Sequence, residues 1–270
     1  MRVDVLITDQ TPPRGRKLMQ AVLDGARNLS IDAHLGLRQG GVGSVVMLYG
    51  MGGADRRMHA GKANVVSFDM GYWSRKGDDR HYRVSIGGYH CPELIFRGEN
   101  PGPARWAKYG LPVAGRFDPF GPIMVVGHGP KSEAIGARGW AADKSREIRR
   151  TFPGRRILYR PKPKRPHEPG VTCDAVSHEA IEYALQKCSL VVCRHSNVAV
   201  DAARLGVPVV CDDGAAAAIY PSALTDWQSQ PSAERRAEFL HRLAWWQWSV
   251  AECRNGAFWQ WINGVLSDLR

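Results

Sequence analysis

The chain has 270 residues and carries 37 Lys and Arg against 26 Asp and Glu, which gives a formal net charge of +11 and a pI of about 9.6. With 44% hydrophobic and 23% charged residues, the composition is that of a globular protein with one large or two small domains, which excludes a disordered tail or a coiled coil. A charge balance this basic favours association with polyanions.

No apolar run approaches the roughly 20 residues that span a bilayer, and residues 1–5 lead directly into a strand-like segment where a secretory signal would need a longer apolar stretch. We therefore expect a cytoplasmic protein without a membrane span, acting as a monomer or weak dimer. The six cysteines include no Cys-x-x-Cys pair, so buried free thiols are expected in preference to structural zinc or a disulfide framework.

Short apolar runs alternate with helical segments in the first half, a pattern typical of βαβ units and a mainly parallel sheet. The pattern predicts strands over 3–8, 44–49, 64–68 and 82–86, and helices over 16–28 and 54–60. Residues 87–121 are rich in Gly and Pro and show little periodicity, so we place an interdomain linker near 112–121.

The second half repeats the alternation more clearly. It predicts strands over 123–126, 156–159, 190–193 and 207–211, and helices over 139–151, 177–187 (with Ser177 as N-cap), 197–205, 232–250 and 257–269. The predicted fold is α/β, with two Rossmann-like domains (1–118 and 119–244) facing each other across a cleft.

The most informative segment, 188–210, contains a strand, a polar turn, a short helix, a Gly stop and a second strand. In a parallel sheet this turn lies at the carboxyl edge, where open α/β folds bind ligands. A helix that opens at Ser196 or Asn197 directs its N–H groups and positive dipole end toward that edge, which suits a phosphate. Asp201 follows Asn197 by one helical turn, where its carboxylate is placed to accept hydrogen bonds from ribose or sugar hydroxyls.

This segment resembles the donor-binding motif of glycosyltransferases of the two-Rossmann-domain (GT-B) fold, in which a Ser-Asn turn precedes an acidic residue, Gly and Pro-Val. The matching positions are Ser196, Asn197, Asp201, Ala202, Gly206, Pro208 and Val209, with Asp201 where the family usually has Glu. The resemblance implies a hexosyl- or pentosyltransferase that uses a nucleotide sugar, a UDP-sugar being favoured, with no further cofactor. It also implies that helices in 245–270 return to the first domain. A purely structural βα unit and a site for another ligand are the alternatives.

Two further segments support a donor site. Arg160 and Lys162 follow a predicted strand, and the prolines on both sides of Lys162 restrict the chain there. Fixed cations at this point would stabilise the negative charge that develops on a departing diphosphate, although a solvated basic loop is the alternative. Gly127, His128 and Gly129 form a turn where backbone can approach a phosphate closely, and His195 is assigned to the same donor site.

A transferase needs a base to deprotonate the acceptor hydroxyl. Asp69 is the predicted base because it follows the strand over 64–68 at its carboxyl end. Asp9, after the first strand, is the competing carboxylate, and His90 and His195 are other possible bases. Either aspartate could instead only cap a turn or a helix. No metal site is expected, since the chain has no Asp-x-Asp pair.

Aromatic and basic residues interleave after the predicted base and form the expected acceptor site: Tyr72, Trp73, Arg75, Lys76 and Arg83. Such a mixture suits a nucleic acid, with cations on phosphates and rings stacked on a base, and it suits a sugar equally. Together with the basic charge, it favours DNA as partner. By fold type, small size and charge, the chain resembles DNA glycosyltransferases that modify hydroxymethylated pyrimidines. A transferase that builds surface glycans and a non-catalytic nucleotide- or nucleic-acid-binding protein are the alternatives. The five tryptophans after residue 244 are predicted to pack in a core.

Overall fold

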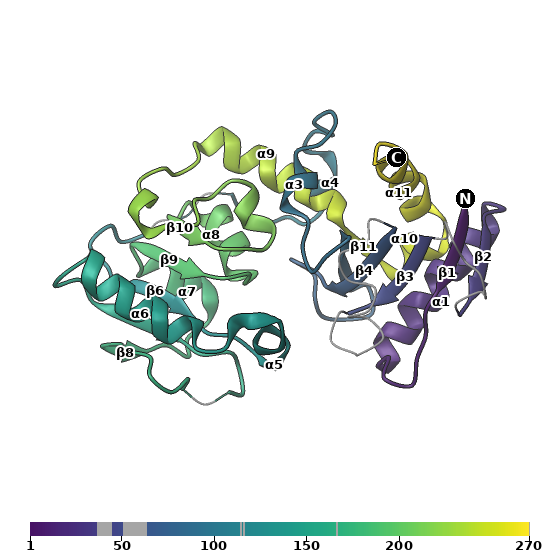
Figure 1. Ribbon diagram of the computed structural model, residues 1–270. Coiled ribbons are helices and arrows are strands. Elements are labelled where there is room, and N and C mark those ends of the chain that lie inside the picture. Colours follow the sequence, from purple (N-terminus) through teal and green to yellow (C-terminus); the bar gives the residue numbers. More distant parts are fainter. Residues whose placement is uncertain (37–44, 51–63, 114, 116, 166, 270) are drawn as a thin grey trace. The chain divides into compact units, whose positions relative to one another are not determined.

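The computed structural model describes residues 1–36, 45–50, 64–113, 115, 117–165 and 167–269 (Figure 1). The chain forms two compact units, the first of residues 1–91 with 244–270 and the second of residues 92–243. The segment expected as a linker, 112–121, belongs to the second unit. The helix expected over 54–60 lies outside the described residues.

The first unit contains a mixed six-stranded sheet in the order β11-β5-β4-β3-β1-β2. Its strands are β1 (Arg2–Val5), β2 (Asp32–Leu35), β3 (Val45–Tyr49), β4 (Val65–Met70), β5 (His81–Ile86) and β11 (Gln247–Ser249). Strands β1 to β4 pair in parallel with one another, while β5 runs antiparallel to both β4 and β11. All five side chains of β3 are buried, as expected for a strand inside a parallel sheet.

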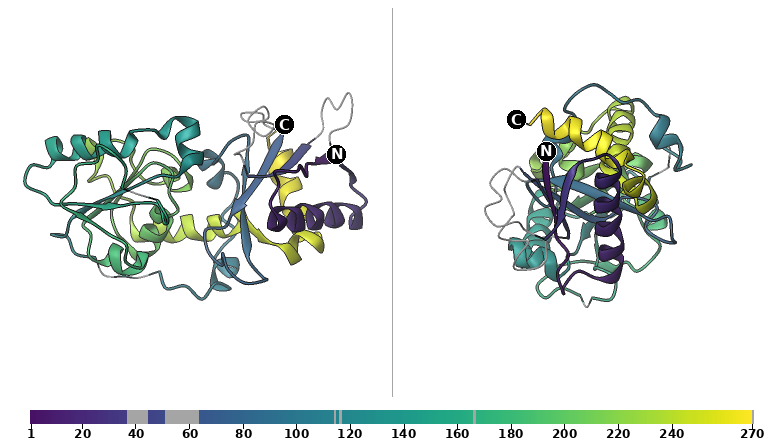
Figure 2. Two further views of the ribbon diagram at one scale, coloured as in Figure 1. Left: turned by 90° about the horizontal axis from the view of Figure 1, so that it is seen from below. Right: turned by 90° about the vertical axis from the view of Figure 1, so that its right-hand side faces the viewer.

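The C-terminal helices α10 (Val250–Arg254) and α11 (Ala257–Ser267) lie beside α1 (Pro13–Asn28) in the first unit (Figure 2). The indole N–H of Trp259 donates to the carbonyl of Val22 at 2.8 Å. A Cβ at Gly25 would lie only 1.9 Å from the carbonyl oxygen of Cys253, so α1 and α10 approach this closely only with glycine there. Trp246, Trp248 and Trp259 are buried, which confirms the predicted core packing for these three rings.

The helix predicted over 232–250 is wrong in its second half. Helix α9 (Ala233–Leu243) ends at Leu243, and a 3-10 turn, η4 (Ala244–Trp246), leads into β11. The aromatic run around Trp248 favours a strand, and pairing with β5 provides one. Ser249 then begins α10 with a capping box, in which its side chain accepts from Glu252 N and the Glu252 carboxylate accepts from Ser249 N.

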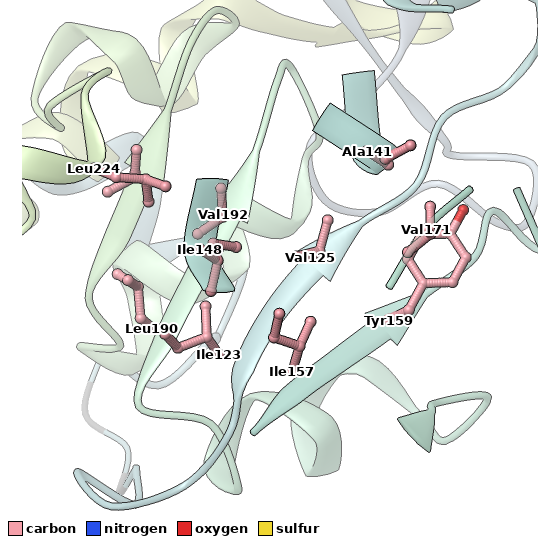
Figure 3. Close-up of a cluster of buried hydrophobic side chains, with 12 residues drawn as sticks. Ile123, Val125, Ala141, Ile148, Ile157, Tyr159, Val171, Leu190, Val192 and Leu224 are labelled. Atoms are coloured by element: carbon pink, nitrogen blue, oxygen red, sulfur yellow. The ribbon is translucent and has the colours of Figure 1, made fainter. Parts of the chain in front are cut away.

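The second unit contains a fully parallel five-stranded sheet in the order β10-β9-β6-β7-β8. Its strands are β6 (Ile123–Val126), β7 (Ile157–Arg160), β8 (Ala175–Val176), β9 (Leu190–Cys193) and β10 (Val209–Cys211). Counted within the unit, this is the 3-2-1-4-5 order of a Rossmann-like sheet, with the order reversing between β6 and β9. Figure 3 shows the core on one face, where side chains of β6, β7 and β9 meet Ala141 and Ile148 of α6 (Trp140–Thr151).

Besides α6 and α9, the described part of the second unit contains eight shorter helical elements. They are α3 (Pro92–Ile95), α4 (Ala104–Ala107), α5 (Pro130–Ser132), the π-helical turn η1 (Glu133–Ala137), α7 (Ile181–Gln186), α8 (Val198–Leu205), η2 (Ala215–Ala218) and η3 (Leu224–Asp226). Ser177 is not the N-cap of α7, because the helix begins four residues later with Ala180 as its N-cap. Instead the Ser177 hydroxyl lies 3.4 Å from the guanidinium of Arg160.

Residues 144–165 are densely basic in sequence, but they do not form one surface. Strand β7 divides this run, so that Arg155 and Arg156 precede the strand while Lys162 and Lys164 follow it at the opposite edge. Arg155 is used internally, since its Nη2 donates to Gly121 O at 2.9 Å and to Ser189 Oγ at 2.5 Å. The run therefore supplies fewer cations to any single partner than its sequence indicates.

None of the helices that the structure describes is both long and apolar enough to cross a membrane. Of the six cysteines, all of which the structure describes, five are buried, as expected, and Cys173 is partly exposed; none forms a disulfide.

Candidate functional site

The candidate donor site lies at the point where the strand order of the second sheet reverses. Strands β6 and β9 are parallel neighbours there, and the chain leaves them through Gly127–Gly129 and through 194–197. Loops that leave neighbouring strands at such a point diverge and leave room for a ligand at the carboxyl edge. The structure thus brings two of the predicted donor segments to one place.

Two imidazoles meet between these loops. The rings of His128 and His195 are stacked, with centroids 5.9 Å apart and an interplanar angle of 30°. Nε2 of His195 shares a 2.6 Å hydrogen bond with Oγ of Ser132, which fixes the orientation of that ring. Both histidines were predicted site residues, whereas Ser132 was not.

Gly127 is required by close packing beneath the loop. A Cβ at this position would lie 2.3 Å from the hydroxyl oxygen of Tyr159, a buried side chain of β7. The loop therefore sits directly on the sheet because residue 127 has no side chain. This packing places His128 over the carboxyl edge of β6.

Cations surround the two imidazoles. Lys162 follows β7 at the same edge, and a Cβ at Gly129 would lie 3.8 Å from its Cγ. Burial, together with the neighbouring charges of His195, Arg194 and Lys162, lowers the pKa of His128 to about 4. At neutral pH His128 is therefore uncharged, in a setting that favours an anion.

Arg160 does not join this group. Its Nη1 donates to the carbonyl oxygen of Glu179 at 2.9 Å, on the side of β7 that faces β8. Burial lowers the pKa of its guanidinium. Of the two cations predicted on this strand end, only Lys162 lies near His128.

The first N–H groups of α8 were expected to be available to a phosphate, but in the structure they already have hydrogen-bond partners. The N–H of Val198 donates to Ser196 Oγ, the N–H of Ala199 to Ser196 O, and the N–H of Val200 to Asn197 O, at 3.0–3.2 Å. Ser196 and Asn197 thus satisfy the groups that a phosphate was expected to use. Asp201 lies one turn after Asn197 as predicted, with only 9% of the residue exposed.

Trp140, Asp212 and Lys144 form a second layer that sequence reasoning missed. The indole of Trp140 meets the ring of His128 edge-on, with centroids 4.9 Å apart, and its N–H donates to Oδ2 of Asp212 at 2.5 Å. Lys144 Nζ lies 3.6 Å from Oδ1 of the same carboxylate. The position of Asp212 directly after β10 was a usable signal, because this residue too follows a strand at the carboxyl edge.

In the first unit, the predicted base Asp69 lies near the carboxyl end of β4, inside a polar cluster. Its Oδ1 accepts from Met70 N at 2.8 Å, and its Oδ2 lies 3.5 Å from Nη2 of Arg83. Nη1 of Arg83 lies 2.7 and 2.9 Å from the two ring nitrogens of His90. The carboxylate of the alternative base Asp9 is fully exposed and lies 4.0 Å from Arg16 Nη2.

The predicted acceptor residues are arranged differently from the expectation. Tyr72 and Trp73 are only 4% and 5% exposed, and both backbone N–H groups donate to Oε1 of the buried Gln247. Burial raises the pKa of Tyr72 to about 12. These two rings do not present open faces for a base or a sugar. Lys76 is exposed and Arg75 half-buried, with Arg75 Nε donating to the carbonyl of Tyr72.

Within the part of the chain that the structure describes, no three His, Cys, Asp or Glu side chains gather in a way that could hold a metal ion.

No protein-family model matches the chain, and no curated protein matches its sequence. Solved structures are similar in fold. Thermosulfurimonas dismutans KpsC, beta Kdo 2,7 transferase, superposes over 96% of this chain and 99% of that chain, with a TM-score of 0.55 at 15% sequence identity. Thermosulfurimonas dismutans KpsC, beta Kdo 2,4 transferase, covers 92% of this chain and 91% of that chain, with a TM-score of 0.49 at 17% identity. The first similarity shows that the chain has the α/β fold of that transferase over nearly its full length.

Proposed function

We propose that the protein is a glycosyltransferase that binds the phosphate part of a nucleotide sugar at the carboxyl edge of the second sheet. The observation that carries the proposal is the meeting of His128, His195 and Lys162 at the point where the strand order reverses. Donors of this kind carry one negative charge on each phosphate, two in a UDP-sugar, and these side chains offer N–H donors and positive charge there.

The similarity in fold supports the same class of reaction. The chain spans 99% of the KpsC beta Kdo 2,7 transferase structure, so the likeness includes both of its units and not a nucleotide-binding module alone. Many activities share Rossmann-like folds, so the proposal depends on the site residues as well.

Within this proposal the residues take distinct roles. Lys162 stabilises the negative charge of the leaving phosphate, while His128 and His195 donate to its oxygens. Asn197 and Asp201, with Ser196 and the backbone of Gly127 and Gly129, hold the nucleoside part. Asp69 of the first unit is the proposed base for the acceptor hydroxyl, with Arg83 and His90 positioning its carboxylate.

A sugar hydroxyl of a surface glycan is the acceptor that we favour. The KpsC protein of similar fold is a beta Kdo 2,7 transferase. The burial of Tyr72 and Trp73 removes the two rings that were expected to stack on a base flipped out of DNA.

Hydroxymethylated DNA is a second candidate acceptor, favoured by the net charge of +11. Several phosphate contacts would make duplex binding fall steeply with salt on a log–log plot. A flat salt response would exclude this acceptor and leave the glycan proposal intact.

The direct test is incubation of the protein with radiolabelled UDP-sugars and nucleotide-activated Kdo, each with glycan acceptors and with hydroxymethylated duplex DNA. We expect label to move to one acceptor class, and K162Q to abolish transfer. Donor binding without turnover on any acceptor would instead favour a non-catalytic binding protein. Absence of both binding and turnover would refute the proposed donor site.

A further inference from the structure

Nε2 of His128 is a buried polar atom with no hydrogen-bond partner among the described residues. Nearly all buried polar groups in proteins are paired, so an unpaired one at a candidate binding site calls for an explanation. A neutral imidazole nitrogen can accept a hydrogen bond, and a protonated one can only donate. The kind of group that can pair with Nε2 of His128 therefore depends on whether the ring is protonated.

The groups that face His128 come from four elements and are mostly basic. His195 stacks on it from the loop after β9, which also carries Arg194, and Lys162 approaches from the loop after β7. Trp140 of α6 contacts the ring edge-on. The carboxylate behind Trp140 belongs to Asp212, and it already accepts from the indole and lies 3.6 Å from Lys144.

We propose that His128 takes up a proton from solvent when the phosphate group of the donor binds, and that Nε2–H then donates to a phosphate oxygen. This inference rests on the proposed function in taking the anion to be the phosphate of a nucleotide sugar. It adds that donor binding is coupled to proton uptake at one named nitrogen.

In the free protein the surroundings of His128 oppose its protonation, and a bound anion favours it. Burial and three neighbouring basic residues hold the pKa of His128 near 4, so the ring is neutral at physiological pH. The diphosphate of a UDP-sugar carries two negative charges, and within hydrogen-bond distance it offsets the positive charges of Lys162 and Arg194. The charged imidazole is then the favoured form because its N–H meets an acceptor.

The sign of the pH dependence follows from this linkage. A group with a higher pKa in the complex than in the free protein makes binding tighter as pH falls between those two values. Anion affinity should therefore rise by up to about tenfold for each pH unit lowered within that window. Below about pH 4 the free protein is protonated as well, so the gain ends.

Sulfate is a suitable probe because it has the shape and charge of a phosphate dianion and exchanges no proton in this range. Long-range 1H–15N spectra of the protein with 15N-labelled histidine report the protonation of each ring, and the H128N variant assigns the His128 signals. With sulfate we expect the titration of His128 to move upward by about one pH unit or more. The signals of His34, exposed on β2 of the first unit, provide a control in the same spectra.

Matched variants separate the steps. H128N should bind sulfate with an affinity that no longer rises as pH falls, whereas H178N, at an exposed position of the same unit, should behave as the unmodified protein. K162Q should weaken sulfate binding and reduce the shift of the His128 titration.

Sulfate binding with an unchanged His128 titration would overturn the inference and leave the donor-site proposal standing. Transfer activity combined with a donor affinity that is independent of pH in the same window would do the same. If neither sulfate nor UDP-glucose nor nucleotide-activated Kdo binds, the anion site itself is refuted, and the proposed function with it.

Discussion

Trp140 joins three parts of the second unit through one side chain, because its N–H donates to the Asp212 carboxylate at 2.5 Å while its ring contacts His128. The start of α6, the end of β10 and the loop after β6 are thereby held together. The hydrogen bond is charge-assisted, and Lys144 lies beside the same carboxylate.

We expect W140F to keep the ring contact with His128 and lose this hydrogen bond. A hydrogen bond to a charged group contributes about 1.5–3 kcal/mol, so urea unfolding should show a loss of that size. A double-mutant cycle with D212N should give a coupling energy of about 1 kcal/mol or more. Additive losses would mean that the two side chains do not act together.

Gln247 has an unusual structural role, since one buried amide oxygen accepts the backbone N–H groups of both Tyr72 and Trp73, at 2.7 and 3.2 Å. We expect Q247L to leave two buried donors without a partner. Each such group costs about 1–3 kcal/mol, so the free energy of unfolding should fall by about 2–6 kcal/mol.

The matched control is Q260L at an exposed position of α11 in the same unit, which should change the stability by about 0.5 kcal/mol or less. Equal losses of unfolding free energy in the two variants would show that the hydrogen bonds of the Gln247 amide do not stabilise the fold.

The strands of the second sheet were the most predictable part of the fold, apart from the two-residue β8, which the sequence analysis did not predict. β6 and β9 were predicted at their observed bounds because each is a short apolar run bounded by turn residues. β11 was not predictable, because a tryptophan-rich run shows helical and strand features together. Only the open edge of β5, which the sequence does not reveal, decides the outcome.

The candidate site could be predicted only in part, for a related reason. Position in the sequence places Gly127, His128, Lys162 and His195 at one sheet edge, and the structure gathers them there. Position in the sequence does not specify where a long side chain points. Arg160 was therefore expected at the site, but its guanidinium donates to the carbonyl of Glu179 instead.

Asp69 should be needed for transfer and not for donor binding, since the residues proposed to bind the donor all lie in the second unit. We expect D69N to lower kcat by about 10²–10⁴-fold, the range for loss of a general base, with donor affinity unchanged. D9N, which changes an exposed carboxylate, should retain activity. Full activity of D69N combined with inactivity of D9N would reverse the assignment.

Gly127 should tolerate no side chain, because a Cβ would lie 2.3 Å from the Tyr159 hydroxyl. We expect G127A to destabilise the protein by about 1–3 kcal/mol and to weaken sulfate binding by displacing His128. Removing the hydroxyl in G127A/Y159F should restore part of both losses. G264A, on α11 where no atom lies within 4 Å, should be neutral or stabilising by up to about 1 kcal/mol. Failure of Y159F to restore any stability would show that the contact is not the cause.

The low pKa of His128 also predicts how stability responds to acid in the absence of any ligand. The folded protein holds this pKa near 4, against about 6.5 in the unfolded chain, so the unfolded state binds more protons between these values. Stability is therefore unaffected above about pH 6.5 and falls as pH decreases toward 4, by at most about 3 kcal/mol from this group. The H128N variant has no titratable side chain at position 128, so its unfolding free energy should depend less on pH across this window than that of the unmodified protein. H178N, a surface change in the same unit, should retain the full dependence, and urea unfolding at pH 7, 5.5 and 4.5 measures all three proteins. Equal slopes for H128N and H178N would show that His128 is not the group held neutral by the fold.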